Sequence, residues 1–244
     1  MKVRKKAILA GLYLSRFDEG GLKALGFTGF VEAFNVIGYA IGAKPASVKN
    51  YRDEFDPYHS NNRKGWHNRT LRDYCKKTMD EFKEVRFDDF TDIIKGFLFD
   101  NYEIEKFIEN IAPIDHSETV AKRLITGRSA EEYFRINYDK IEHFFGFNLT
   151  DTTNLACGFD FRLTRSTDFY CVEVKGLSAK SGSIRLTEKE YNTARILKNS
   201  YCLFIVSNFV EKPNHNIVFN PIESNLKFQK NERLIHEISF AAII

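Results

Sequence analysis

The sequence predicts an α+β protein in which a helical first half precedes a sheet-containing second half. Two observations lead to this prediction. Apolar residues recur every three to four positions through the first 126 residues, as in amphipathic helices. From about residue 147, short runs with apolar residues at every second position replace them, as in strands that bury one face. With 244 residues, 43% of them hydrophobic, the chain is long enough for one large core or two modest ones.

The expected helices of the first half have apolar stripes with three- and four-residue spacing. They comprise residues 5–17, 30–42, 46–54, 87–99 and 102–111. The helical pattern ends in the segment from 115 to 127, and we place the domain boundary there. Residues 1–126 then form a helical region and residues 127–244 form an α/β core.

The second half combines expected strands with two helices. The expected strands are 158–164, 169–176, 201–209, 214–220 and 234–244, and the expected helices are 129–145 and 187–199. Thr187 and Glu190 open the second helix in the spacing of a capping box. Strands 158–164 and 169–176 are expected to form a hairpin around residues 165–168. This hairpin would bring Asp160 toward Glu173 on one face of the sheet.

The strand FYCVEVKG carries an acid and a base on one face. If Val172 and Val174 face the core, Glu173 and Lys175 share the opposite face. Two carboxylates that approach each other, here Glu173 and Asp160, repel unless a cation lies between them. Carboxylate oxygens suit Mg²⁺, and a nearby lysine can orient a metal-bound water. A simple ion pair between Glu173 and Lys175 is the alternative, but it leaves Asp160 unexplained.

Asp160 followed by Glu173-Val174-Lys175 resembles the D…(D/E)-x-K signature of the PD-(D/E)xK nuclease superfamily, which includes most type II restriction endonucleases. The resemblance implies an α/β nuclease core with a mixed central sheet. It also implies that Asp160, Glu173 and the Val174 carbonyl bind Mg²⁺ and that Lys175 is the catalytic lysine.

The surrounding sequence, over roughly residues 127–210, is similar to the nuclease-like domain at the C-terminus of No Vein-type proteins. Gly127-Arg128-Ser129-Ala130-Glu131 opens a helix, and the resemblance gives Glu131 the role of the acid that this family places before the sheet. Phe159 stands where the superfamily name has a proline, which weakens the motif without removing it.

Charge is unevenly distributed in the helical region. Residues 44–77 contain nine Lys/Arg and four Asp/Glu, whereas residues 78–110 contain four and ten. Basic residues interleaved with aromatics are typical of nucleic-acid contact, and a solvated polar loop is the alternative. Asp53 and Asp56 are expected to hold neighbouring arginines in place. The candidate DNA-binding residues are Lys49, Arg52, Arg63, Lys64, Trp66 and Arg69.

Several other functional classes lack support in the sequence. The four cysteines form no C-x-x-C pair, which suits a reducing compartment and argues against a zinc knuckle or a disulfide framework. The six histidines show no zinc-binding spacing, and an HNH-type site lacks its acid-histidine strand pair. No P-loop, dinucleotide fingerprint or serine-hydrolase motif is found, and no membrane segment is expected.

Together these features predict a cytoplasmic, Mg²⁺-dependent type II restriction endonuclease. Its partner would be double-stranded DNA. Only the resemblance implies a homodimer, which would suit a short palindromic target. Two alternatives stay open: a modification-dependent or repair nuclease, and a non-catalytic DNA-binding module that retains the nuclease fold.

Overall fold

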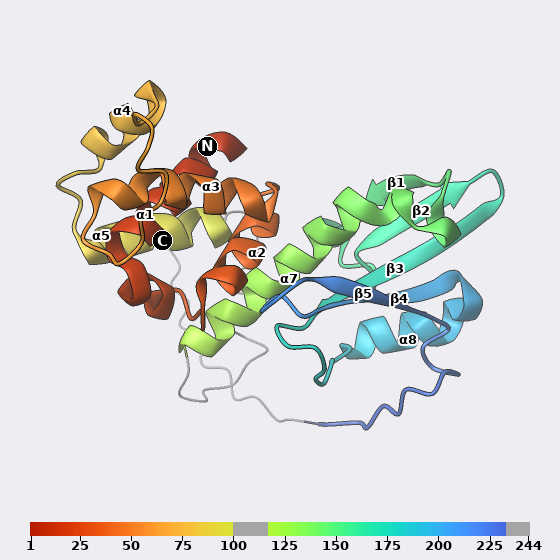
Figure 1. The fold of residues 1–244 in the computed structure, drawn as a ribbon. Helices are drawn as coiled ribbons and strands as arrows, with labels where there is room; N and C mark the ends of the chain where they lie inside the picture. The colour runs from red at the N-terminus through yellow and green to blue at the C-terminus, as the bar shows by residue number, and fades with distance from the viewer. Residues whose placement is uncertain (100–116, 233–244) are drawn as a thin grey trace, which may run out of the picture.

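The computed structural model describes residues 1–99 and 117–232 (Figure 1). Its helical part consists of α1 (Val3–Ala24), α2 (Phe30–Ala40), α3 (Pro45–Phe55), the 3₁₀ helix η1 (Asp56–Tyr58), α4 (Asp73–Glu81) and α5 (Phe87–Phe99). The expected helices at 5–17, 30–42, 46–54 and 87–99 are thereby confirmed. The structure adds α4, whose buried residues are Cys75 and Thr78, too few to give an apolar stripe. The expected helix at 102–111 and the expected strand at 234–244 lie outside the described residues.

Helix α1 packs closely against α3, and Gly11 makes this approach possible. A Cβ atom at Gly11 would lie 2.5 Å from the Tyr51 Cβ and 2.8 Å from the Arg52 backbone nitrogen. Any side chain would therefore push the two helices apart. The seam between them is apolar, with Leu12, Val48 and Phe55 all buried.

The second part contains a five-stranded mixed sheet in the order β1-β2-β3-β4-β5. The strands are β1 (Asn148–Asp151), β2 (Phe161–Arg165), β3 (Asp168–Gly176), β4 (Tyr201–Ser207) and β5 (Asn214–Phe219). Strands β3 and β4 are parallel, and the other neighbours are antiparallel. The fold is thus α+β with a mixed sheet, as predicted. The structure adds β1, whose sequence NLTD contains a single apolar residue.

Strands β2 and β3 form the predicted hairpin. Arg165 pairs with Asp168, which leaves Ser166 and Thr167 as a two-residue loop. Ser166 adopts a positive φ of 53°, as tight hairpin turns require. The register places Phe161 opposite Val172. Asp160 therefore lies just before the first residue of β2, next to the second half of β3.

The helices α7 (Ser117–Asn137) and α8 (Glu188–Leu197) cover opposite faces of the sheet (Figure 1). On the α7 face, the Phe134 ring packs on Phe161 and Phe204, with centroid distances of 5.1 and 4.8 Å. On the α8 face, Ala194 belongs to a buried cluster with Cys171 and Tyr201. Strand β3 thus contributes one set of alternating side chains to each layer.

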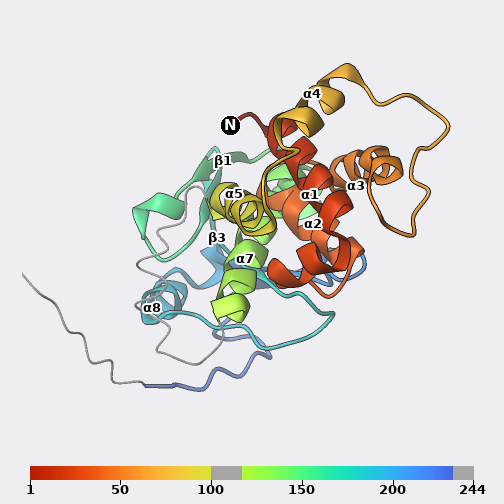
Figure 2. The ribbon, with the colours of Figure 1, turned by 90° about the vertical axis from the view of Figure 1, so that its left-hand side faces the viewer.

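Helix α7 joins the helical part to the sheet. It begins ten residues before the predicted boundary at 126/127, which therefore falls inside a continuous helix, and it ends at Asn137 rather than at 145. Two 3₁₀ helices follow, η2 (Tyr138–Lys140) and η3 (Glu142–Phe144). On its other side, the Ser129 hydroxyl donates to the Val36 carbonyl of α2 at 2.8 Å. Figure 2 views the molecule from the helical part and shows α1, α2 and α3 clustered to one side of α7.

A buried carboxylate on α2 fastens the two parts together. Glu32 accepts hydrogen bonds from the Thr28 backbone N–H and hydroxyl, both at 2.8 Å, and from the Ser178 hydroxyl just after β3. Lys122 Nζ of α7 lies 2.8 Å from the same carboxylate. Burial works against its ionisation, but the hydrogen bonds from Lys122, Ser178 and Thr28 outweigh burial and leave the pKa of Glu32 below its ordinary value.

Among the residues that the structure describes, no helix combines the length and apolar character needed to cross a bilayer.

Candidate active site

Strand β3 presents its two charged residues on the face that α8 covers. Val172 and Val174 are buried in the core on the α7 side. Because side chains alternate along a strand, Glu173 and Lys175 point the other way. In the parallel register, Glu173 lies opposite Leu203 of β4 and Lys175 opposite Ile205. The predicted sharing of one face by this acid and this base is confirmed.

Asp160 is held beside Glu173 by hydrogen bonds to the backbone of β3. Its N–H donates to the Val172 carbonyl at 3.0 Å, and its Oδ2 accepts from the Val174 N–H at 2.8 Å. The Asp160 carboxylate thus accepts a hydrogen bond that a backbone carbonyl would accept if the pairing of β2 with β3 continued before Phe161. The N–H and C=O of one strand residue point to the same side. The Val174 carbonyl therefore faces the sheet edge at which Asp160 lies.

Gly158 sets the path of the chain into Asp160. It adopts a positive φ of 93°, and a Cβ atom there would lie 2.3 Å from Thr193 Oγ1 of α8. Its carbonyl accepts a hydrogen bond from the Tyr201 hydroxyl at 3.1 Å. The close contact between the loop before β2 and α8 therefore requires glycine at position 158. The same contact helps to fix Asp160 at the start of β2.

Lys175 connects two carboxylates that come from different elements. Its Nζ lies 2.5 Å from Glu173 Oε1 and 2.8 Å from Glu190 Oε2. Glu190 lies in the first turn of α8, where the predicted capping box with Thr187 is confirmed. The sequence marks Glu190 as a cap and as part of the segment that resembles the No Vein-type domain, but it assigns Glu190 no role in the site. The signal that could have placed it in the site is the L-T-x-x-E pattern that follows the E-x-K strand.

Glu173 is buried, and Asp160, Lys175 and Glu190 are partly buried around it. Burial raises the pKa of Asp160 to about 6. Burial and then the charge of Asp160 raise the pKa of Glu173 well above its ordinary value. For Lys175, burial favours the neutral amine, but Glu173 and Glu190 outweigh it and raise the pKa, so the ammonium stays charged. When all four groups are ionised, three carboxylates face one ammonium. One divalent cation would balance the two negative charges that remain.

The donor set fits Mg²⁺, although no metal shell is preformed. Among the described residues, no three His, Cys, Asp or Glu side chains are arranged as a complete set of metal ligands. The oxygens of Asp160, Glu173 and the Val174 carbonyl are nevertheless the hard donors that Mg²⁺ prefers, and this ion keeps several waters in its shell. The Lys175 ammonium currently lies against Glu173, where it provides part of the charge compensation.

Glu131 lies on α7, one helical turn before Arg135. The Arg135 guanidinium lies over the Phe161 ring, 5.4 Å from its centroid, at the start of β2. Because residues four apart share a helix face, Glu131 is on the side of α7 that faces β2. The side chains of Glu173 and Lys175 point to the opposite face of the sheet, which α8 covers. The charge of Glu131 is among those that raise the pKa of Arg135. A direct role of Glu131 in metal binding stays a prediction.

Residues 130–219 match the family model described as protein NO VEIN, C-terminal. The members of this family are nuclease-like domains. The matched segment contains every member of the cluster around Lys175, and it leaves the helical part outside. No curated protein and no solved structure matches the chain.

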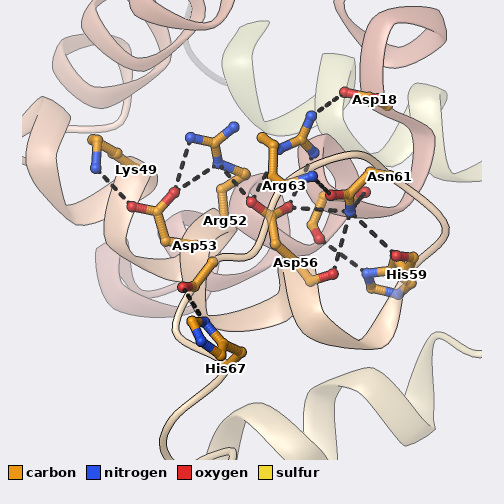
Figure 3. Close-up of polar contacts among 11 residues, drawn as sticks. Asp18, Lys49, Arg52, Asp53, Asp56, His59, Asn61, Arg63 and His67 are labelled. Carbon is orange, nitrogen blue, oxygen red and sulfur yellow. Dashed lines mark hydrogen bonds and ion pairs between the residues drawn. The ribbon is translucent and has the colours of Figure 1, made fainter.

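The predicted DNA-binding residues lie outside the matched residues 130–219, and their side chains differ in solvent exposure. Lys49 Nζ lies 2.6 Å from Asp53. Arg52 is only 8% exposed and contacts both Asp53 at 2.8 Å and Asp56 at 3.3 Å (Figure 3). The prediction that Asp53 and Asp56 hold the local arginines is confirmed. The burial of Arg52 removes it from the side chains that a DNA phosphate can reach in this conformation.

Arg63 is also bound to carboxylates. Its Nε lies 3.0 Å from Asp56, and its Nη1 contacts Asp18 at the kink of α1 (Figure 3). Its guanidinium lies 4.6 Å from the centroid of the Phe30 ring. Since two acids and a ring hold this side chain, Arg63 fastens the loop after α3 to α1 and α2.

The end of the same loop leaves three of the candidates at or near the surface. Lys64 and Arg69 are exposed, and Trp66 is half-buried. The Arg69 guanidinium stacks on Trp66, 3.9 Å from the ring centroid. The backbone N–H of Trp66 donates to the Asp53 carbonyl at 2.7 Å, so α3 fixes the position of this pair. A cation stacked on an indole offers both charge and a flat apolar surface.

Proposed function

We propose that the protein is a Mg²⁺-dependent endodeoxyribonuclease of the restriction type that hydrolyses phosphodiester bonds in double-stranded DNA. The observation that carries this proposal is the meeting of Asp160, Glu173 and Lys175 at one sheet edge, inside a segment that matches a nuclease-like family. A helical part with the exposed Lys64 and Arg69 and the half-buried Trp66 accompanies this core. For a palindromic site the protein would act as a two-fold homodimer, with each protomer cutting one strand.

Each residue of the cluster has a role that follows from its position. Asp160, Glu173 and the Val174 carbonyl would hold Mg²⁺, and the resemblance gives Glu131, on α7, a supporting role. Bound Mg²⁺ supplies a Lewis acid and lowers the pKa of a coordinated water. Lys175 keeps its positive charge beside the two acids, so it can orient the attacking water and stabilise the negative charge that develops on the phosphate.

Cleavage in the presence of Mg²⁺ and its loss with EDTA test this function. The purified chain is incubated with long unmodified DNA, and the products are separated by gel electrophoresis. Discrete fragments that require Mg²⁺ are expected, because site-specific cutting produces defined ends. The same reactions on methylated DNA distinguish a modification-dependent nuclease. DNA that is bound but intact under all of these conditions would support the non-catalytic binding module instead.

The affinity for Mg²⁺ is expected to rise as the pH increases through about 6, because burial raises the pKa of Asp160 to about 6 and the ionised form binds the cation. This shift has the opposite effect on stability. Between about pH 4 and about pH 6 the folded state binds this proton more tightly than the unfolded chain, so the contribution of Asp160 to stability falls as the pH rises.

Isothermal titration calorimetry with Mg²⁺ at about pH 5 and about pH 8 measures this dependence. A weaker dependence is expected for Asp160→Asn, which keeps the size of the side chain and removes one of the two titrating acids. Equal affinities at both pH values in the unmodified protein would show that these acids do not bind the metal.

A further inference from the structure

We propose that Glu190 is a positioning residue that holds the Lys175 ammonium at the site from the first turn of α8. This inference rests on the proposed nuclease function, and it assigns Glu190 a part in the reaction that the E-x-K signature does not include. It follows from three features of the structure: the shared lysine, the fixed carboxylate and the separation of Glu190 from the proposed metal ligands.

The first feature is that Lys175 is held from two sides. Its Nζ contacts Glu173 on its own strand at 2.5 Å and Glu190 on α8 at 2.8 Å. The Lys175 side chain is 21% exposed, and that of Glu190 is 17% exposed. At this degree of burial the pair is shielded from the solvent screening that makes surface ion pairs weak. The two carboxylates together fix the ammonium in one place.

The second feature is that Glu190 is itself held in position. Its Oε2, the atom that contacts Lys175, also accepts the Thr187 backbone N–H at 3.0 Å. In return, its own N–H donates to the Thr187 hydroxyl at 3.2 Å. The capping box therefore orients the carboxylate toward β3. A lysine has four rotatable side-chain bonds, so a fixed partner at its tip removes much of the freedom that Lys175 would otherwise have.

The third feature is that Glu190 lies outside the proposed donor set for Mg²⁺. When Glu173 turns its oxygens toward a cation, it can no longer hold Lys175 through the same atoms. Glu190 comes from another element and does not face this competition. It therefore keeps the ammonium beside the reacting phosphate after the metal has bound. Because the cap requires only an acceptor oxygen, whereas the ion pair requires a charge, the two roles of Glu190 can be separated.

The test compares three variants in steady-state cleavage assays with Mg²⁺. Glu190→Gln keeps the capping oxygen and removes the charge, and glutamine is an accepted residue in this capping position. Glu190→Ala removes both. Glu188→Gln is the matched control, because Glu188 is an exposed acid in the same turn. We expect kcat to fall about tenfold or more in both Glu190 variants with little change in KM, and wild-type values in the control.

The melting temperatures separate positioning from capping. Glu190→Gln is expected to melt close to the wild type, and Glu190→Ala a few degrees lower because the cap is lost. A fall in kcat without a fall in melting temperature is therefore the mark of a positioning role. If Glu190→Gln keeps the wild-type kcat, the inference is overturned.

A second readout uses the metal-free protein and needs no activity. An amine-reactive acylating reagent labels lysines, and mass spectrometry gives the rate for Lys175 relative to the exposed Lys180. We expect this relative rate to rise several-fold in Glu190→Gln and to stay unchanged in Glu188→Gln. If the wild type does not cleave DNA, the proposed function fails, and labelling alone decides whether Glu190 holds Lys175. An unchanged rate in Glu190→Gln would then overturn the inference.

Discussion

Replacing Lys175 by methionine is expected to lower the rate of DNA cleavage on the order of 10² to 10³-fold, because it removes a fixed positive charge from the site of phosphate chemistry. Methionine keeps the unbranched shape of the lysine stem. The affinity for DNA should change little, because the candidate DNA-binding residues Lys64, Trp66 and Arg69 belong to the helical part. The rate of cleavage and the affinity for an uncut duplex are measured on the same protein.

The same substitution is expected to reduce stability. Without Lys175, the carboxylates of Glu173 and Glu190 lose the cation that lies between them. Glu173 is only 3% exposed. Breaking a buried pair by removing one partner costs about 3 to 5 kcal/mol, and protonation of the remaining acid reduces this cost. The free energy of unfolding should therefore fall more at high pH than at low pH, because Glu173 takes up a proton as the pH is lowered.

Two further variants separate the loss of cleavage from the loss of stability. The double variant Lys175→Met with Glu173→Gln should recover most of the lost stability, because no unpaired buried charge remains, and it should stay inactive. Lys180→Met is the matched control, since Lys180 lies on the loop after β3 and is highly exposed. Cleavage by Lys175→Met within a few-fold of the wild-type rate would contradict the proposed role of this lysine.

Short-range patterns explain why much of the fold could be predicted. The β2–β3 hairpin follows from period-two alternation on both sides of a polar turn, and the start of α8 follows from its capping box.

The bounds of helix α7 were predicted less well for a physical reason. It packs on α2 through Ser129 and on the sheet through Phe134, so its apolar side chains do not form a single stripe.

The candidate site shows the same division between local and long-range information. Glu173 and Lys175 lie on β3 and Asp160 directly precedes β2, so the local hairpin brings them near one another. Glu190 reaches Lys175 only because α8 packs on that face, which no local pattern encodes. Charge counts were less informative still. They place Arg52 and Arg63 in a basic segment, but they do not show that acids of α3, η1 and α1 bind both side chains.

Replacing Asp56 by alanine is expected to lower the free energy of unfolding by about 3 kcal/mol. It removes a carboxylate that Arg52 and Arg63 share, and each arginine keeps one other acid, Asp53 or Asp18. The Asp56 side chain is completely buried. It accepts from Arg63 Nε and Nη2, both at 3.0 Å, and lies 3.3 Å from Arg52 Nε (Figure 3). Denaturant unfolding measures the loss. Asp89→Ala is the control, because Asp89 forms an exposed ion pair with Arg86, which contributes little to stability.

The Asp56 substitution should also weaken DNA binding, although Asp56 itself repels phosphate. Arg63 fastens the loop after α3 through Asp56, and that loop carries Lys64 and the stacked pair of Trp66 and Arg69. Once the loop is released, binding DNA must also order it, which costs conformational entropy. Arg69→Ala removes an exposed candidate DNA-binding charge and should lower the affinity for DNA. Little loss of stability is expected, because Glu54, which pairs with Arg69, keeps its ion pair with Arg72. If Asp56→Ala lowers stability but binds DNA as tightly as the wild type, this loop is not a DNA-binding element.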